Sequence, residues 1–206
     1  MEKETIRTRE EIHQVIGFTV LRAFLSYDIA EPAFLETVQS LQHDLKATGA
    51  DLKLVNPQIL HFTIRFLGEI DETDKLQIID ALKGKVENFG VDLRFLGIGA
   101  FPDERRISVI WVGIDPASAT NLETQASGVN SLLLVVPTLK NVDSAKFNPH
   151  VTIARVRSGR SKDNLVNFIH ENKTKDFGTS QIRNLRLKLS HLTPAGPEYS
   201  DLHVFE

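Results

Sequence analysis

The sequence of 206 residues contains no cysteine. This absence excludes disulfide bonds, catalytic thiolates and zinc sites built from cysteine, and it agrees with the cytoplasmic location that we expect. No apolar run approaches the roughly 20 residues that a membrane-spanning helix needs. The first seven residues, MEKETIR, mix both charges without an apolar stretch, so we expect no signal peptide and no membrane attachment.

An excess of charge of one sign is also missing. The 24 Lys and Arg residues nearly balance 27 Asp and Glu, which leaves a formal net charge of −3. Any binding to nucleic acid must therefore depend on a local basic patch. Between His150 and Leu192, nine Lys or Arg residues stand against three Asp or Glu. This stretch is either a solvated face or part of such a patch.

Alternating apolar patterns predict an α+β fold. Predicted strands cover residues 19–29, 60–67, 91–100, 107–114, 150–156, 181–189 and 201–205, and predicted helices cover 32–49, 71–88, 117–134 and 162–172. Several strands are joined by short turns, such as the turn expected at residues 101–104, that suit only antiparallel neighbours. We therefore predict mixed, mostly antiparallel sheets with helices outside.

Residues 1–18 are predicted to be an N-terminal extension to a single domain that covers residues 19–206. Within the extension, Thr8-Arg9-Glu10-Glu11 has the pattern of a helix capping box and predicts a short helix. The chain has no long heptad pattern or exposed apolar stripe, so we expect a monomer.

A short motif occurs twice, 89 residues apart. His61-Phe62-Thr63-Ile64-Arg65 and His150-Val151-Thr152-Ile153-Ala154 share a His-x-Thr-Ile core. A Phe-Gly pair follows each histidine, after 28 and 27 residues, and is expected to open a strand. We infer two copies of one structural unit that pack about a pseudo-twofold axis, so that both motifs can face a single cleft.

The alternation of side chains in a strand predicts which residues of each motif lie together. His61, Thr63 and Arg65 are expected on one face, with Phe62, Ile64 and Phe66 on the other, in the core. His150 and Thr152 are expected to share a face in the same way. By the same alternation, Arg155 and Arg157 are expected to point away from His150.

Two imidazoles and two hydroxyls suit reactions at a phosphodiester. One neutral histidine can take a proton from water while the other, protonated, gives a proton to the leaving oxygen. The threonine hydroxyls can donate hydrogen bonds to the non-bridging oxygens. This chemistry needs no metal or cofactor, and we expect none. The alternative of a two-histidine metal site lacks a third ligand at a fixed spacing.

Five landmarks in order resemble the RNA 2′,3′-cyclic phosphodiesterases, also called 2′-5′ RNA ligases, of the 2H phosphoesterase superfamily. The resemblance runs from about Leu21 to the C-terminus. The landmarks are Arg22-Ala23-Phe24, the segment from His61 to Glu69, Phe101-Pro102 with Trp111-Val112-Gly113, the segment from Pro149 to Arg155, and the closing Leu189-Ser190-His191-Leu192-Thr193-Pro194 with Gly196-Pro197 and Tyr199.

The resemblance implies a bilobal fold with both motifs in a central groove, and hydrolysis that leaves a 2′-phosphate. It implies His61 as the proton donor, His150 as the base, and Thr63 and Thr152 as phosphate-binding hydroxyls. The position of Arg65 is often lysine in the family, and either cation can reach a phosphate.

The resemblance also implies partners. These are RNA ends or nucleotides with a 2′,3′-cyclic phosphate, transfer-RNA fragments among them. Two alternatives stay open, namely reversible 2′-5′ ligation of RNA at the same site and a noncatalytic module that binds nucleotides or RNA.

Other residues are weaker candidates. Phe24 and Tyr27 can stack on a base, although core packing is expected for Phe24. Arg105 and Arg106 follow the predicted turn and can contact the nucleotide or stay exposed. The remaining histidines are expected to be structural or exposed; they are His13, His43, His170, His191 and His203.

Overall fold

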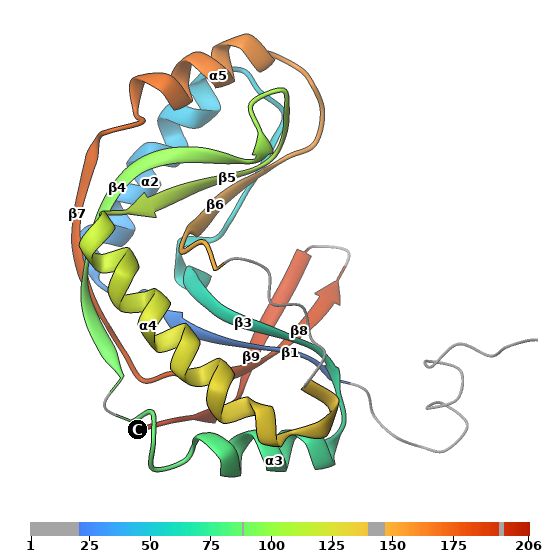
Figure 1. Ribbon diagram of the computed structural model, residues 1–206. Helices are drawn as coiled ribbons and strands as arrows, with labels where there is room; N and C mark the ends of the chain where they lie inside the picture. Colours follow the sequence, from blue (N-terminus) through green and yellow to red (C-terminus); the bar gives the residue numbers. More distant parts are fainter. Residues whose placement is uncertain (1–20, 88, 140–146, 194–195) are drawn as a thin grey trace, which may run out of the picture.

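A computed structural model gives the structure of the protein and describes residues 21–87, 89–139, 147–193 and 196–206. The predicted N-terminal extension and its helix lie outside the described residues. In the described ranges, no helix is both long and apolar enough to span a membrane. The predicted α+β class is confirmed, with two sheets and helices outside them (Figure 1).

The first sheet has four strands in the order β3-β1-β8-β9. Its strands are β1 (Leu21–Asp28), β3 (His61–Ile70), β8 (Arg186–Thr193) and β9 (Gly196–Val204). All three strand pairs are antiparallel. The first motif therefore opens an edge strand of this sheet.

The second sheet has five strands in the order β2-β6-β5-β4-β7. Its strands are β2 (Leu52–Leu54), β4 (Gly90–Asp103), β5 (Arg106–Ile114), β6 (Val151–Val156) and β7 (Asp176–Arg183). These pairs are antiparallel too. The second motif leads into β6, which lies beside β5 as β3 lies beside β1.

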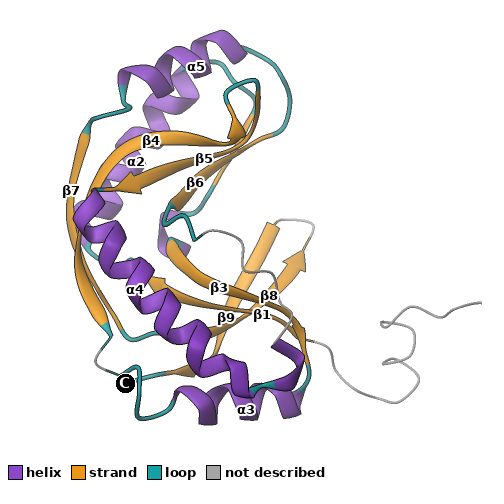
Figure 2. Cartoon of the chain, in the orientation of Figure 1, coloured by secondary structure: helices purple, strands orange, loops and turns teal. Residues whose placement is uncertain are grey.

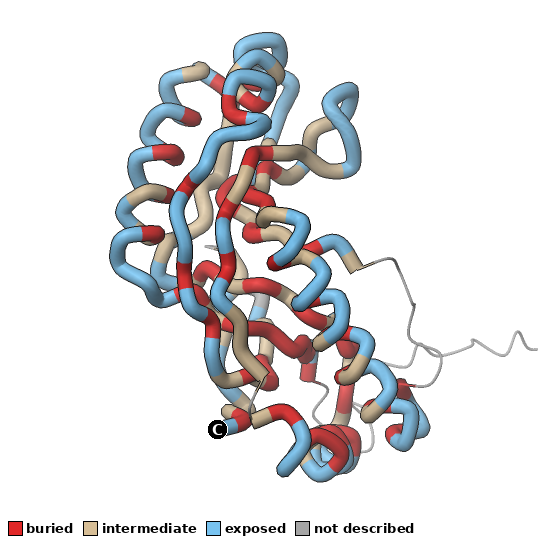
Figure 3. The backbone as a smooth tube through the Cα atoms, turned by 60° about the vertical axis from the view of Figure 1, so that its left-hand side comes forward, coloured by how far each residue is buried: buried red, intermediate tan, exposed pale blue. Residues whose placement is uncertain are grey.

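Helices pack against the outer sides of the sheets (Figure 2). Helices α2 (Pro32–Ala47) and α5 (Lys162–Glu171) pack on the five-stranded sheet, and α3 (Glu72–Leu82) packs on β3. Helix α4 (Pro116–Leu132) contacts both β3 and β4. Buried positions of the helices recur on one side and exposed positions on the other, as Figure 3 shows.

The two sheets are joined by β4 and β7. These strands pair antiparallel from Gly90↔Arg183 to Leu96↔Asp176, and β4 then continues beside β5. Only Asn184 and Leu185 separate β7 from β8 in the other sheet. Asn184 has a φ of 56°, in the left-handed region that asparagine tolerates better than most residues. The single strand predicted over residues 181–189 is therefore wrong, because this residue breaks it into two.

Other boundaries also differ from the predictions, and for two of them the local reason can be named. The helix predicted to reach residue 88 ends at Leu82, and Gly84 follows with a φ of 73°, the conformation that commonly ends helices. The turn predicted at residues 101–104 is shorter, because β4 extends to Asp103. The Asp103 carboxylate accepts the backbone N–H groups of Arg105 and Arg106 at 2.8 and 3.1 Å, which closes the turn.

A single core anchors both motifs. Phe62, between His61 and Thr63, is fully buried, and its ring centroid lies 5.9 Å from that of Phe95 in β4. Phe95 in turn stacks on Phe34 of α2. The residue that follows His61 therefore packs into the same core as the helices of the other sheet.

Both His-x-Thr-Ile segments contain a β-bulge at the isoleucine. In the first, Thr63 pairs with Ser26 and Arg65 with Leu25, so that Ile64 has no partner of its own. In the second, Thr152 pairs with Trp111 and Ala154 with Ile110, and Ile153 is the unpaired residue. A bulge puts one extra residue on one strand and reverses the alternation of side chains beyond it.

The side chain of Gln42 holds the second bulge in place. Gln42 lies on α2, is 5% exposed, and its Nε2 donates to the carbonyl oxygens of Val55 at 2.7 Å and Ile153 at 2.9 Å. It therefore joins α2 to the bulged segment of β6 and to the residue after β2.

We predict that Gln42→Leu lowers the free energy of unfolding by about 1–3 kcal/mol, because it removes a donor from buried carbonyl groups. The measurement is urea denaturation of the variant and of Gln39→Leu, an exposed position on the same helix. Equal midpoints for the two variants would contradict a structural role of the Gln42 amide.

Candidate functional site

His61 is the first residue of β3 and lies among aromatic rings. Its Nδ1 is 2.9 Å from the carbonyl oxygen of Ile59, at the end of the 3₁₀ helix η1 (Pro57–Ile59). Its ring centroid lies 5.2 Å from that of Phe24 in β1 and 5.1 Å from that of Tyr199 in β9. The ring is thus held by its own chain on one side and packed by rings from β1 and β9.

His150 directly precedes β6 and has an equivalent environment. Its Nδ1 lies 2.7 Å from the carbonyl oxygen of Asn148. The ring of Phe101 is edge-on to it at 4.8 Å between centroids, and Trp111 lies at 6.3 Å. A Cβ atom added to Gly99 would lie 2.1 Å from Cζ2 of Trp111, so a glycine is needed there for the indole to lie over β4.

The hydrogen bond at Nδ1 assigns the tautomer of both rings. In each motif the partner is the carbonyl oxygen two residues before the histidine. A carbonyl only accepts, so Nδ1 carries the hydrogen in both rings. In the neutral form, each Nε2 is then a proton acceptor and is the nitrogen left for chemistry.

The fold brings the two motif strands together. Cα atoms of β3 and β6 approach within 8 Å of one another, although the two motifs are 89 residues apart. The charge on His150 also acts on His61 and helps to lower its pKa. The two imidazoles therefore interact electrostatically across the two sheets.

Both histidines have a lowered pKa. Burial is the main cause for His61, and the charges of Lys188 and His150 add to it, whereas the carbonyl of Ile59 and the carboxylate of Asp28 act in the opposite direction. Burial also lowers the pKa of His150, against the hydrogen bond to Asn148. At neutral pH both rings are therefore neutral without a bound anion.

We call the sheet faces that carry His61 and Thr63, and His150 and Thr152, the motif faces. Thr63 and Thr152 each lie two residues after their histidine and before the bulge, so that they share its face. Both threonines are partly buried. Four of the five predicted site residues thus lie on the motif faces of strands that contact each other.

The fifth, Arg65, lies on the opposite face. Because of the bulge at Ile64, Arg65 pairs with Leu25 and points to α4, where Nη1 donates to Asn130 at 2.8 Å. Its Nη2 donates to the carbonyl oxygen of Leu139 at 3.0 Å, in the 3₁₀ helix η3 (Pro137–Leu139). The prediction that Arg65 shares the face of His61 is therefore wrong.

Phe66 was expected in the core and is instead 70% exposed. It pairs with Phe24 on the motif face, and the two ring centroids are 6.2 Å apart. The strict alternation used to predict its position does not hold beyond the bulge at Ile64.

Arg155 shows the same effect in the second motif. Arg155 pairs with Val109, and Thr152 pairs with Trp111. Val109 and Trp111 are two residues apart in β5 and share a face, so Arg155 lies on the motif face with Thr152. Its charge acts on Tyr199 in β9, where it lowers the pKa of the phenol, although burial dominates and raises that pKa. The prediction that Arg155 points away from His150 is therefore wrong, and the bulge at Ile153 is the reason.

Of the weaker candidates, the two aromatic residues are buried and the two arginines are exposed. Tyr27 is fully buried and its hydroxyl donates to Gln125 of α4 at 2.8 Å, so it cannot stack on a base. Phe24 is 3% exposed and packs against His61. Arg105 and Arg106 are exposed at the β4–β5 turn.

Three aromatic residues of the site, Tyr199, Phe101 and Trp111, were not predicted as site residues. Each occurs in a landmark of the resemblance, which was the only sequence signal for them. They are contributed by β9, β4 and β5, strands that contain neither motif.

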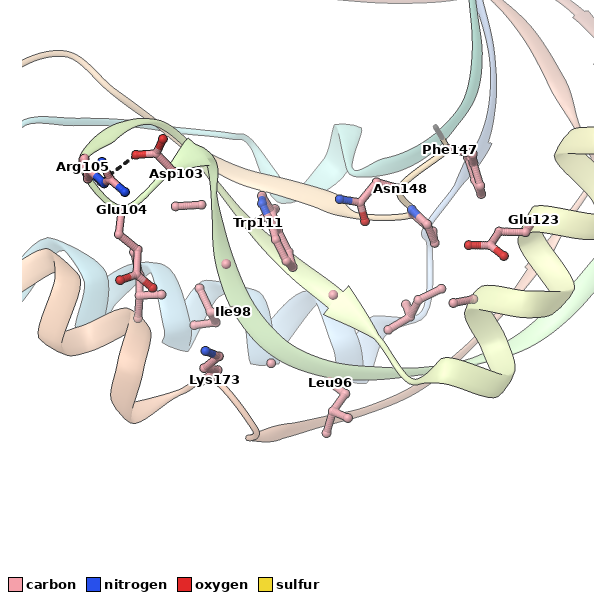
Figure 4. Close-up of a pocket in the computed structure, with 18 residues that line it drawn as sticks. Leu96, Ile98, Asp103, Glu104, Arg105, Trp111, Glu123, Phe147, Asn148 and Lys173 are labelled. Atoms are coloured by element: carbon pink, nitrogen blue, oxygen red, sulfur yellow. Dashed lines mark hydrogen bonds between the residues drawn. The ribbon is translucent and has the colours of Figure 1, made fainter. Parts of the chain in front are cut away.

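A hollow of about 950 Å³ lies beside the second motif. Figure 4 shows it extending from Arg105 at the β4–β5 turn, past Trp111, to Phe147 and Asn148. Asn148 is the residue whose carbonyl group binds His150, but neither motif histidine lines the hollow. Within the described parts of the chain, no three His, Asp or Glu side chains gather as a metal site would require.

We predict that the rings of His61 and His150 both titrate below pH 6.5, because burial disfavours the imidazolium form. His150→Ala is expected to raise the midpoint of His61, since it removes a nearby positive charge. Long-range ¹H–¹⁵N NMR spectra across a pH series measure the titration midpoints of the two rings in wild type and that of His61 in the variant. A midpoint above 6.5 for either ring in the free protein would contradict this electrostatic description.

Comparisons with known proteins agree with this architecture. The profile of the family described as LigT like phosphoesterase matches residues 29–111. An RNA 2′,3′-cyclic phosphodiesterase of Methanothermobacter thermautotrophicus is 36% identical over 190 residues, which cover 90% of this chain and 98% of the relative. One from Aquifex aeolicus is 32% identical over 191 residues, with 90% and 97% covered.

Solved structures show the same fold. A crystal structure of the protein TT0787 of Thermus thermophilus superposes with a TM-score of 0.71 at 24% identity, covering 90% of this chain and 97% of that one. E. coli LigT complexed with 3′-AMP gives a TM-score of 0.68 at 19% identity, with 91% and 98% covered. The chain belongs to the LigT-like phosphoesterase family of the 2H phosphoesterase superfamily.

Proposed function

We propose that the protein hydrolyses the 2′,3′-cyclic phosphates of RNA ends or nucleotides to 2′-phosphates, without a metal ion, by general acid and base catalysis with two histidines. The observation that carries this proposal is the pair of equivalent imidazoles on strands that approach each other. Each ring is fixed through Nδ1 and leaves Nε2 for proton transfer. The relatives of Methanothermobacter thermautotrophicus and Aquifex aeolicus, named for this activity, support the substrate class.

The proton transfers are assigned as the family resemblance implies. Nε2 of neutral His150 takes a proton from water as the water oxygen bonds to phosphorus. The bond between phosphorus and the 3′-oxygen breaks, and protonated His61 gives its proton to that oxygen. Protons and charge balance, and the phosphate stays on the 2′-oxygen.

The two histidines must differ in protonation for this mechanism. His150 is suited to be the base, because its lowered pKa leaves it neutral at pH 7. His61 needs a proton, which its neighbour Asp28 favours and which a bound phosphate anion favours further. The acid therefore becomes charged as substrate binds.

The negative charge of the transition state needs donors on the motif faces. Thr63 and Thr152 supply hydroxyl groups on the faces of their histidines, and we assign them to the non-bridging oxygens. Arg155 supplies a guanidinium group on the second motif face, which can pair with two phosphate oxygens. We assign this role to Arg155 rather than Arg65, whose guanidinium donates to α4 and η3.

The hollow beside Asn148 gives the proposal a place for an RNA nucleotide next to the reactive phosphate. Trp111 borders it, and an indole face supports a stacked base of any kind. We therefore propose RNA ends, including those of transfer-RNA fragments, as substrates of a monomeric enzyme. Ligation of a 5′-hydroxyl end would use the same groups in reverse.

We predict that His61→Ala and His150→Ala each lower kcat/KM for a 2′,3′-cyclic nucleotide by about 10²-fold or more, since each removes one proton transfer. His43→Ala, an exposed position on α2, serves as the control and keeps full activity. The product is identified as 2′- or 3′-phosphate by chromatography, with and without EDTA.

Full activity in both motif variants would refute the two-histidine mechanism. Loss of activity in EDTA would refute metal independence, and a 3′-phosphate product would refute the assigned leaving group. Nucleotide binding without turnover would indicate the noncatalytic module instead. A parallel assay with cyclic-phosphate and 5′-hydroxyl RNA halves tests ligation.

We predict opposite effects for two arginine variants. Arg155→Met is expected to lower kcat/KM by about tenfold or more with little change in stability, because it removes a cation from the motif face. Arg65→Met is expected to lower the free energy of unfolding by about 1 kcal/mol, because two hydrogen bonds to α4 and η3 are lost. Steady-state kinetics and urea denaturation of both variants measure these two effects. The reverse pattern would place Arg65 at the phosphate.

A further inference from the structure

Four charged side chains form a network on the motif face of the four-stranded sheet. Nζ of Lys188 lies 2.9 Å from each carboxylate oxygen of Asp28 and 3.1 Å from Oδ1 of Asp201. Arg186 pairs with Asp201 through Nη1, and its Nε is 3.4 Å from Asp28. Two positive and two negative charges are thus held together, without net charge.

Lys188 is the most buried member of this network. The residue is 8% exposed, and the exposed fractions of its partners' side chains are about three times that of its own. Taking an ammonium group out of water costs several kcal/mol unless it is paired and hydrogen-bonded. Its ion pairs with Asp28 and Asp201 offset that cost, and they also hold the Asp28 carboxylate in place.

The network lies next to His61. Lys188 pairs with Phe24, whose ring packs on the His61 ring, and Asp28 is the direct cross-strand partner of His61. Side chains of directly paired residues point to the same face of a sheet. Strand β1, which carries Asp28, lies between β3 with His61 and β8 with Lys188. The Asp28 carboxylate therefore lies between the imidazole and the ammonium group.

We propose that Lys188 is a positioning residue for His61, which holds the Asp28 carboxylate and so sets how readily the imidazole accepts a proton. With Lys188 in place, Asp28 supports the imidazolium form only weakly, and His61 gains its proton together with the substrate phosphate. Without Lys188, Asp28 would favour the imidazolium form of His61 more strongly in the free protein. This role refines the proposed function, since it concerns the histidine assigned as the acid.

The charges around His61 are consistent with this role. Asp28 on β1 raises the pKa of His61, whereas Lys188 on β8 and His150 next to β6 lower it, all within the larger lowering by burial. Tyr199 on β9 also contacts His61, through its aromatic ring. The carboxylate and the ammonium group thus act in opposite directions on one imidazole.

The experiment compares the titration of His61 in Lys188→Met, Asp28→Asn and wild type, by long-range ¹H–¹⁵N NMR of the full chain. Removing the ammonium group is expected to raise the midpoint of His61 by about half a pH unit or more, and removing the carboxylate to lower it similarly. Lys188→Arg keeps the charge and should stay near wild type. Lys75→Met removes an ion pair to Glu72 on α3 and is the matched control without effect.

Kinetics supply the second readout. In the pH profile of kcat/KM, the limb that His61 controls should move in the same directions as the NMR midpoints. An unchanged His61 midpoint in a folded Lys188→Met variant would overturn the proposal, whatever the activities and whatever the result for Asp28→Asn. If Lys188→Met does not fold, Asp28→Asn decides by the same criterion.

The proposed function fails separately, if wild type does not hydrolyse cyclic phosphates. The NMR midpoints still decide the role of Lys188 in that case, because they require no turnover.

Discussion

The β-bulge in each His-x-Thr-Ile segment determines which side chains reach the site. Before the bulge, the histidine and threonine share a face; after it, the order reverses, which sends Arg65 to α4 and brings Arg155 to the motif face. Bulges commonly redirect side chains next to active sites. Here the same bulge occurs at the same motif position in both sheets, so one backbone feature is used twice.

The β4–β7 pair lies where the chain passes between the two sheets. These strands belong to one ladder, while β4 continues into β5 and β7 leads into β8. The β4–β7 pair belongs to the five-stranded sheet, and the chain passes from β7 into the four-stranded sheet through Asn184 and Leu185. Strand β3 of one sheet contacts β6 of the other, and the charge on His150 acts on His61.

Much of this arrangement was predictable from the sequence, and the errors have identifiable physical causes. The duplicated motif indicated both histidines and both threonines, because residues two apart in a strand share a face. Arg65, Phe66 and Arg155 were misplaced because periodicity carries no sign of an inserted residue in the ladder. The Lys188 network was not predicted, because its members become neighbours only through strand pairing across 173 residues of sequence, from Asp28 to Asp201.

The hydrogen bonds at Nδ1 connect each ring to its own segment of chain, two residues away. Neither ring relies on the opposite lobe for its orientation. A change in the angle between the two sheets would alter the distance between the two Nε2 atoms. Each imidazole plane would stay fixed relative to its own sheet. The orientation of each imidazole and the distance between the two imidazoles are thus set by different parts of the protein. A hinge motion between the sheets would change the distance and leave the orientations as they are.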